Sequence, residues 1–221
     1  MTFPCPHIPP LASAIDLAYL VHAVSTTSTA TIPACQDGDL GVFLAWGTGG
    51  GSTTPAAIAM PAGWTSVGGV VWGSGDRHRL QVFAKLLADS DGGATLTGIT
   101  GGQSSRNTVY LFRGAIPLSS LGFGDFEGVV TSGDPPAVTI ACTNASRKAV
   151  LAMALRAQRT NETWTPITFS PAETGAHDLL DEGRIQVLWL AFPDNAAVDV
   201  SADTGDSGTG NTFATWYIDV E

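Results

Sequence analysis

Four sequence patterns occur twice along this chain, in the same order and at a nearly constant spacing. Ala34–Ala45 matches Ala141–Ala152, and both segments begin with Ala-Cys. Trp64-Thr65 matches Trp164-Thr165, and Asn107-Thr108 matches Asn211-Thr212. The fourth match is between Arg79-Leu80-Gln81-Val82 and Arg184-Ile185-Gln186-Val187. An ordered recurrence of this kind marks a repeated structural unit. The period of about 105 residues is too long for a solenoid repeat and fits a complete small β-sandwich.

The repeat predicts an all-β protein with two tandem, jelly-roll-like β-sandwich domains, over residues 1–115 and 116–221. Gly114 and Pro117 fit a change of chain direction at this boundary. The 26 glycines and 13 prolines, with Ser and Thr between short apolar runs, are typical of many short strands joined by turns. In the first copy we expect strands at residues 16–24, 29–35, 40–46, 80–86, 94–99 and 108–113.

The tryptophans divide into shared and unshared positions. Trp64 and Trp164 occupy equivalent places in the two copies, which favours a packing role common to both. Val82 and Val187 are equivalent in the same way, and we expect all four residues in the cores. Trp46 and Trp72 have no counterpart. A position in the core or at a subunit interface is one interpretation of these two residues, and stacking on a ligand is the other.

The charge and the apolar runs exclude several partners. The formal net charge is −10, and the densest basic stretch, Arg77-His78-Arg79, is too short for a phosphate-binding surface. The longest apolar run, residues 149–155, is far shorter than the roughly 20 residues of a spanning helix. Although its Ala, Leu and Met favour a helix, the repeat assigns this run to a strand. We therefore expect neither nucleic acid nor membrane as a partner.

The first ten residues and the cysteines predict folding in a cytoplasm. The first ten residues lack the positive and apolar regions of a secretory signal. The three cysteines, Cys5, Cys35 and Cys142, are widely spaced and form no C-x-x-C pair, which favours reduced thiols over a disulfide framework or a zinc site.

No pattern in the chain carries recognisable catalytic chemistry. Gly205-Asp206-Ser207-Gly208 matches the nucleophile segment of chymotrypsin-like proteases over four residues only, with no histidine in the surroundings that a triad requires. The acidic stretches at Asp89-Ser90-Asp91 and at Asp199 to Asp206 contain calcium-type ligands but do not fit the EF-hand pattern. The sequence therefore predicts no enzyme, no metal and no cofactor, although it cannot reveal a hydrolase whose acid and base are dispersed.

The motifs of the first copy resemble a β-sandwich domain of tailed-bacteriophage and prophage virion proteins, also found in some bacterial surface proteins. They are Asp37-Gly38-Asp39 before an apolar strand, Pro61-Ala62-Gly63-Trp64-Thr65, the aromatic and Lys alternation of Leu80–Lys85, and the closing Tyr110-Leu111-Phe112-Arg113-Gly114. The second copy departs from the family, with Asn144-Ala145-Ser146-Arg147 in place of the Gly-Asp turn.

This resemblance implies a non-enzymatic accessory protein of a virion assembled in a bacterial cytoplasm. Its expected partners are capsid or tail subunits, with symmetric copies of the chain held by apolar contacts. A capsid decoration or spike suits a tandem chain better than a tail-tube subunit. The alternative is a tail, fibre or surface module that binds a carbohydrate or receptor, in which a host glycan would stack on an exposed Trp46 or Trp72.

Overall fold

The computed structural model describes residues 18–49, 53–72, 78–100 and 104–114, together with strand segments between 121 and 220. These residues form antiparallel sheets, and the helical element among them is the single 3-10 turn η1 (Asp89–Asp91). The prediction of an all-β chain is therefore confirmed for the described residues. Trp164 and Ser207 lie outside them.

The first half is built on a five-stranded antiparallel sheet with the order β1-β7-β3-β5-β4. Its strands are β1 (Ala18–Ser25), β3 (Leu40–Thr48), β4 (Thr65–Trp72), β5 (His78–Leu86) and β7 (Ser104–Arg113). A second, two-stranded sheet pairs β2 (Thr29–Thr31) with β6 (Thr95–Thr97). The strand expected over 29–35 ends at Thr31, because its partner β6 begins only at Thr95, after a turn in which the Ala94 N–H donates to the Asp91 carbonyl.

The described strands between 121 and 220 form a six-stranded and a three-stranded sheet. The larger has the order β13-β14-β11-β16-β8, with β9 also pairing β16, and the smaller has the order β10-β15-β12. The strands are β8 (Leu121–Phe123), β9 (Glu127–Val130), β10 (Val138–Ile140), β11 (Ala149–Ala157), β12 (Ile167–Ser170), β13 (His177–Asp181), β14 (Ile185–Phe192), β15 (Val198–Ala202) and β16 (Thr212–Val220). Residues 149–155 are thus in a strand, as the repeat predicts.

The strands of the two large sheets have the same relative order along the chain, β1-β7-β3-β5-β4 in the first half and β8-β16-β11-β14-β13 in the second. The sequence match departs from this order at one strand: Trp64 and Trp164 align β4 with β12, but β13 occupies the place of β4 and β12 lies in the smaller sheet. The register differs as well, since Gln81 lies opposite Ala45, whereas Gln186 lies opposite Arg156 rather than Ala152. This shift is an even number of residues, so it preserves the two-residue alternation of the strands.

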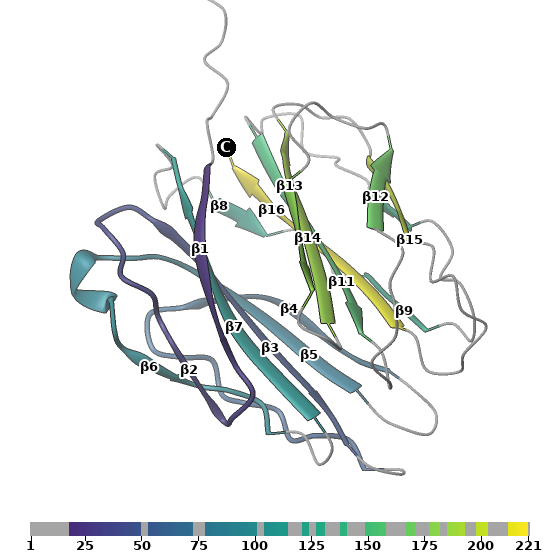
Figure 1. Ribbon diagram of the computed structural model, residues 1–221, viewed down its shortest axis with the longest axis horizontal. Coiled ribbons are helices and arrows are strands. Elements are labelled where there is room, and N and C mark those ends of the chain that lie inside the picture. Colours follow the sequence, from purple (N-terminus) through teal and green to yellow (C-terminus); the bar gives the residue numbers. More distant parts are fainter. Residues whose placement is uncertain are drawn as a thin grey trace, which may run out of the picture.

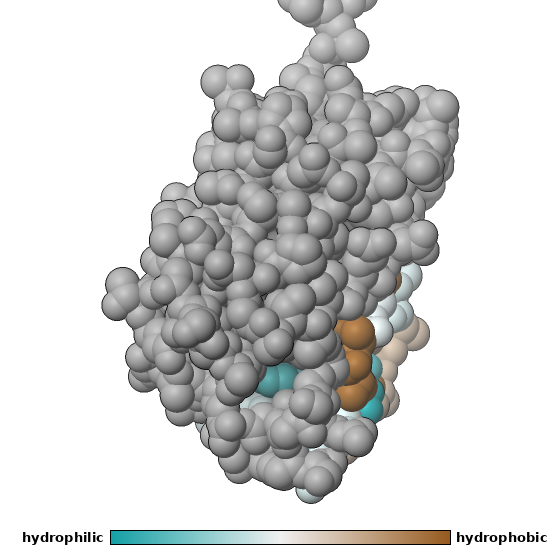
Figure 2. Space-filling model, turned by 90° about the vertical axis from the view of Figure 1, so that its right-hand side faces the viewer, coloured by the Kyte–Doolittle hydropathy of each residue, from teal (hydrophilic) through white to brown (hydrophobic). Residues whose placement is uncertain are grey.

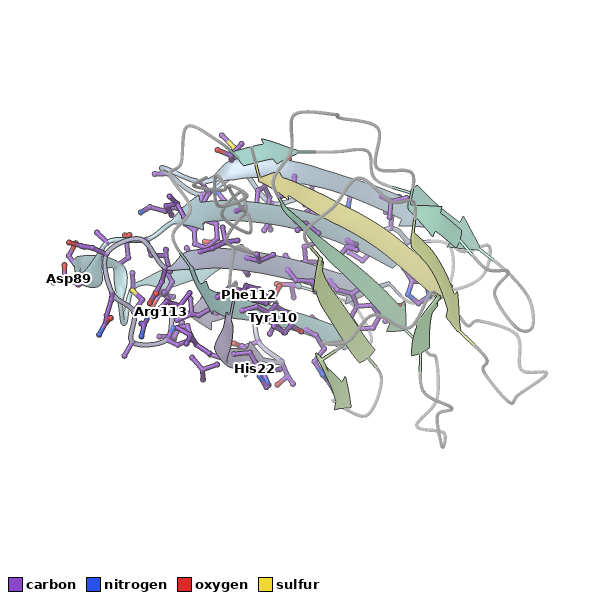
Figure 3. The ribbon with its side chains drawn as sticks, turned by 90° about the horizontal axis from the view of Figure 1, so that it is seen from above. His22, Asp89, Tyr110, Phe112 and Arg113 are labelled. Atoms are coloured by element: carbon purple, nitrogen blue, oxygen red, sulfur yellow. The ribbon has the colours of Figure 1, made fainter. Side chains whose placement is uncertain are left out.

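Both faces of the central strand β3 are buried. One face carries Phe43, which packs in a core with Phe83, Val109 and residues of the small sheet. The opposite face is also buried, and its side chains include Leu44, Trp46, Leu80, Tyr110 and Phe112. Figures 1 and 3 show the sheet of β11, β14 and β16 lying over the five-stranded sheet, and β9 and β16 contact β4.

This double burial corrects the expectation for Trp46. The sequence suggested a residue exposed to a ligand or a subunit, but Trp46 is 0% exposed within the chain itself. Its position on a central strand between two covered faces is the physical reason. Large exposed apolar side chains of the described residues are few, namely Leu20, Val21, Met60 and Val71, and Figure 2 shows brown surface only in a small area of the described part.

A buried asparagine joins the large sheet of the first half to the small one. Asn107 on β7 is 0% exposed. Its Oδ1 accepts a hydrogen bond from the Ile99 N–H (2.8 Å), and its Nδ2 donates to the carbonyls of Ile99 (3.0 Å) and Thr27 (2.7 Å). Ile99 follows β6 and Thr27 precedes β2, and these two positions lie at the same end of the antiparallel pair, so one amide holds both strands of the small sheet at that end. Gly98 is required here because a Cβ would lie 2.2 Å from the Asn107 side chain.

An ion pair links the beginning of β3 to the end of β7. The Asp39 carboxylate is 1% exposed and accepts hydrogen bonds from Arg113 Nε (2.7 Å) and Nη2 (2.8 Å). It also accepts from the Gln36 N–H (2.8 Å), which closes the turn that Gly38 makes with φ of 86°. The hydrogen bonds from Arg113 are the main reason that the pKa of Asp39 lies below its usual value, ahead of the bond from Gln36 and against the effect of burial.

The Asn107→Ala variant is expected to be less stable than the parent by about 2–4 kcal/mol, because the substitution leaves the buried N–H and carbonyl of Ile99 unpaired. Chemical denaturation of both proteins measures this difference. Thr97→Ala, at an exposed position of the same small sheet, is the control and should change stability by less than about 0.5 kcal/mol. Equal effects of the two substitutions would contradict the role of the amide.

Acid is expected to destabilise the fold through Asp39. The pKa of Asp39 is lower in the folded state than in the unfolded state. Its contribution to the free energy of unfolding is therefore complete above the unfolded-state pKa near 3.8 and is lost as the pH falls through the folded-state pKa. The melting temperature should therefore fall more steeply below about pH 4 in the parent than in Asp39→Asn. Thermal unfolding between pH 7 and pH 2.5 tests this, and parallel curves for the two proteins would refute it.

Candidate functional site

A groove of about 470 Å³ lies between β6 and the extended segment over residues 59–62. Ile32, Trp64 and Leu96 are the buried apolar residues that line it, and they form its floor. Met60, which is 55% exposed, stands at the rim. The groove therefore combines an apolar base with an accessible opening, which is the usual character of a binding site.

The floor depends on a tight turn in the Pro61–Thr65 motif. The Trp64 N–H donates to the Pro61 carbonyl (3.1 Å), and Gly63 has a φ of 78°, a conformation that a side chain disfavours. The turn directs Trp64 inward, where it is 4% exposed and meets Phe43 edge-to-face with centroids 6.1 Å apart. Gly41 leaves room for the indole, because a Cβ there would lie 3.1 Å from its ring.

One wall of the groove contains an ion pair. Lys85 Nζ lies 2.7 Å from Asp91 Oδ1, and Asp91 Oδ2 accepts from the Ala88 N–H at 2.8 Å. The hydrogen bond from Lys85, followed by that from Ala88, lowers the pKa of Asp91. Both side chains are about one-fifth exposed, at 22% and 21%.

The acidic stretch at Asp89–Asp91, which the sequence presents as calcium-type ligands, has other partners in the structure. Asp91 uses one carboxylate oxygen for Lys85 on β5 and the other for the Ala88 N–H, and the Asp89 N–H donates to Asp37 Oδ1 (2.9 Å). Figure 3 shows Asp89 at the same end of the sheet as Arg113. Among the described residues, no three His, Cys, Asp or Glu side chains are arranged to hold a metal ion.

The residues singled out from the sequence do not gather into one site. Trp64 and Val82 are both buried, at 4% and 0% exposed, on opposite faces of the large sheet. Val187 lies on β14 opposite Leu155, and Trp72 ends β4 opposite His78. Of these four candidates, Trp64 is the one among the described groove-lining residues, where it lies with Pro61, Ala62 and Lys85 of the sequence motifs.

Trp46 lies at the far end of the other face, beside His78. The two rings are 5.8 Å apart and tilted by 36°. The indole Nε1 and the nearby Thr48 Oγ1 are buried without a hydrogen-bond partner. Since the ring is enclosed, it offers no surface on which a sugar could stack.

Cys35 does not supply a reactive thiolate. Its Sγ donates to the Ala88 carbonyl (3.2 Å). Burial, followed by the nearby carboxylates of Asp91 and Asp39, raises the pKa of this thiol. A thiol with a raised pKa stays protonated at neutral pH and is a poor nucleophile.

The groups that line the groove are an ion pair, hydroxyls, backbone and apolar side chains. These groups are suited to binding a ligand.

Sequence reasoning did not find this groove. Lys85 was noticed as part of an alternating strand and Asp91 as a loop carboxylate, but their pairing joins residues on either side of a turn. Met60 carries no sequence signal beyond a large apolar residue between prolines. The lining comes from several separate segments, and only the fold brings them together.

Comparison with known proteins gives no relative. No family model, curated protein or solved structure matches this chain. Within the part of the chain that the structure describes, no helix reaches the length and apolarity that crossing a membrane requires.

Replacing Trp64 is expected to test the packing of the groove floor. Trp64→Ala should lower the free energy of unfolding by about 3–5 kcal/mol, because it leaves a cavity beside Phe43, and Trp64→Phe should cost less. Met60→Ala, at the exposed rim of the same groove, is the control, with a change below about 0.5 kcal/mol. Urea denaturation compares the three, and a Trp64→Ala effect no larger than that of Met60→Ala would contradict the assignment.

Proposed function

We propose that this chain is a non-enzymatic structural protein of a tailed-bacteriophage virion, a decoration or spike component on the particle surface. It comprises two tandem jelly-roll-like sandwiches, residues 1–115 and 116–221, assembled in the bacterial cytoplasm. Its partners are other virion proteins, and protein contacts hold it in symmetric copies. The identical strand order of the two large sheets supports the two-domain division.

The proposal rests on the contacts among the motifs that carry the family resemblance, all of which lie in the first half of the chain. Asp39, from the Gly-Asp motif, is ion-paired with Arg113, from the closing Arg-Gly motif. Trp64, from the Pro-x-Gly-Trp motif, packs on Phe43 in the apolar strand that follows Asp39. Residues that form a framework are the ones that a shared fold retains, so their contacts support the likeness to virion β-sandwich domains.

The competing proposal is a tail, fibre or surface module that binds a host glycan. It needs an exposed aromatic face, and Trp46 is fully buried. The side chain of Trp72 lies outside the described residues. The groove beside β6 places Trp64 at its floor with only 4% exposure, which leaves little ring surface for stacking. The observations therefore favour the structural role.

Immunogold electron microscopy on density-gradient fractions of the native source tests the proposal. We expect gold over the heads of large particles, and an antibody against an unrelated cytoplasmic protein serves as the control. Gold at the tail would support the tail or fibre alternative. Recovery of the chain only as a soluble protein at the top of the gradient would refute the virion role.

Attachment to the particle is expected to resist salt. Charged residues make up 14% of the chain, so apolar burial rather than ion pairing should dominate its contacts. After a wash in about 1 M NaCl, where charge interactions are screened within roughly 3 Å, most of the chain should remain in the particle fraction. Its release into the supernatant would show that charges hold it.

A further inference from the structure

The small sheets of the two halves differ by one strand. In the three-stranded sheet, β15 lies between β10 and β12. Following the chain through both halves, β2 corresponds to β10 and β6 corresponds to β15. The sequence match aligns β12 with β4, which belongs to the large sheet of the first half, so no strand of the described residues takes the place of β12 beside β6. Among these residues β6 therefore pairs on one side only, with β2.

The backbone of β6 presents its polar groups at this vacant side. The Ile32 N–H donates to Ala94 (2.9 Å) and the Gly98 N–H donates to Ser28 (2.7 Å), which fixes the hydrogen-bonding phase of the β2–β6 ladder. Because antiparallel bonds alternate, the N–H and C=O groups of Thr95 and Thr97 point away from β2. They therefore face the side of β6 on which no described strand pairs with it.

The groove lies along this same edge. Thr95, Leu96 and Thr97 line it on one side and the extended segment over residues 59–62 lines it on the other. The floor of Ile32, Leu96 and Trp64 can receive apolar side chains, and Met60 at the rim adds further apolar surface. Lys85 is neutralised by Asp91, so neither residue offers an unpaired charge that would select a charged ligand.

We propose that the groove accepts an extended peptide segment of another protein, which pairs with Thr95–Thr97 as β12 pairs with β15. The second half indicates the chemistry of the occupant: β12 reads Ile-Thr-Phe-Ser, with apolar and polar residues alternating, and it runs antiparallel to β15. Strand addition at an open edge draws affinity from main-chain hydrogen bonds and specificity from alternate side chains. This inference does not depend on the virion role.

The test uses the full chain and a synthetic peptide with the sequence of residues 165–172, which contains the β12 segment. The peptide is titrated into ¹⁵N-labelled protein and the amide signals are followed by NMR. We expect saturable shifts of the Thr95 and Thr97 amides at peptide concentrations below about 1 mM. A peptide with proline in place of the residue equivalent to Thr168 is the control, because it cannot complete the ladder.

A matched pair of protein variants locates the binding edge. Thr95→Pro removes an outward N–H of β6, while Thr31→Pro removes an outward N–H from the opposite edge of the same sheet, since Thr31 faces Thr95 in the ladder. Loss of one or two hydrogen bonds should weaken binding by about tenfold or more in Thr95→Pro and leave Thr31→Pro unchanged. Met60→Glu, an exposed change that spares the backbone, should also weaken binding.

Three outcomes would overturn the proposal. The first is no binding of the peptide up to about 1 mM. The second is equal affinity of the parent and Thr95→Pro, or shifts confined to β1 or β4, the edges of the large sheet. The third is a concentration-dependent shift of the Thr95 and Thr97 amides without peptide, which would identify a second copy of this chain as the occupant.

Discussion

The side-chain amide of Asn107 is the interaction on which the first half depends, because it joins two sheets that share no backbone ladder. Its three hydrogen bonds reach the segments that flank both strands at one end of the small sheet, and Gly98 gives it room. A fully satisfied polar group in an apolar core fixes one arrangement of its neighbours. The position of β6, and with it the groove, therefore follows from one buried residue.

The sequence motifs serve both the framework and the groove. The motif residues Asp39, Trp64 and Arg113 hold strand ends and turns together, and of these only Trp64 reaches the groove. The groove walls combine Pro61, Ala62 and Lys85 of the motifs with residues between the motifs, such as Met60 and Thr95. One turn, over Pro61 to Trp64, therefore both seats a core tryptophan and shapes the groove beside β6.

The sequence predicted the strands whose patterns are local. Alternation in Leu80–Leu86 and the apolar run of Leu40–Trp46 correspond to β5 and β3. The apolar run Leu40–Trp46 also indicates that Trp46 is buried, because continuous apolar residues are typical of strands covered on both faces. β4 was missed because Gly68 and Gly69 weaken a strand pattern, although Gly69 is needed where a Cβ would lie 2.9 Å from the Leu80 carbonyl. The groove depends on contacts between distant segments, which no local pattern encodes.

The burial of both faces of β3 has a consequence for synthesis. A ribosome makes the first half before the strands that lie over its large sheet, so Leu44, Leu80 and Phe112 emerge while their covering partner is still untranslated. Exposed apolar surface of this kind promotes aggregation of partly made chains. The first half therefore cannot complete the burial of this face until the strands of the second half have been made.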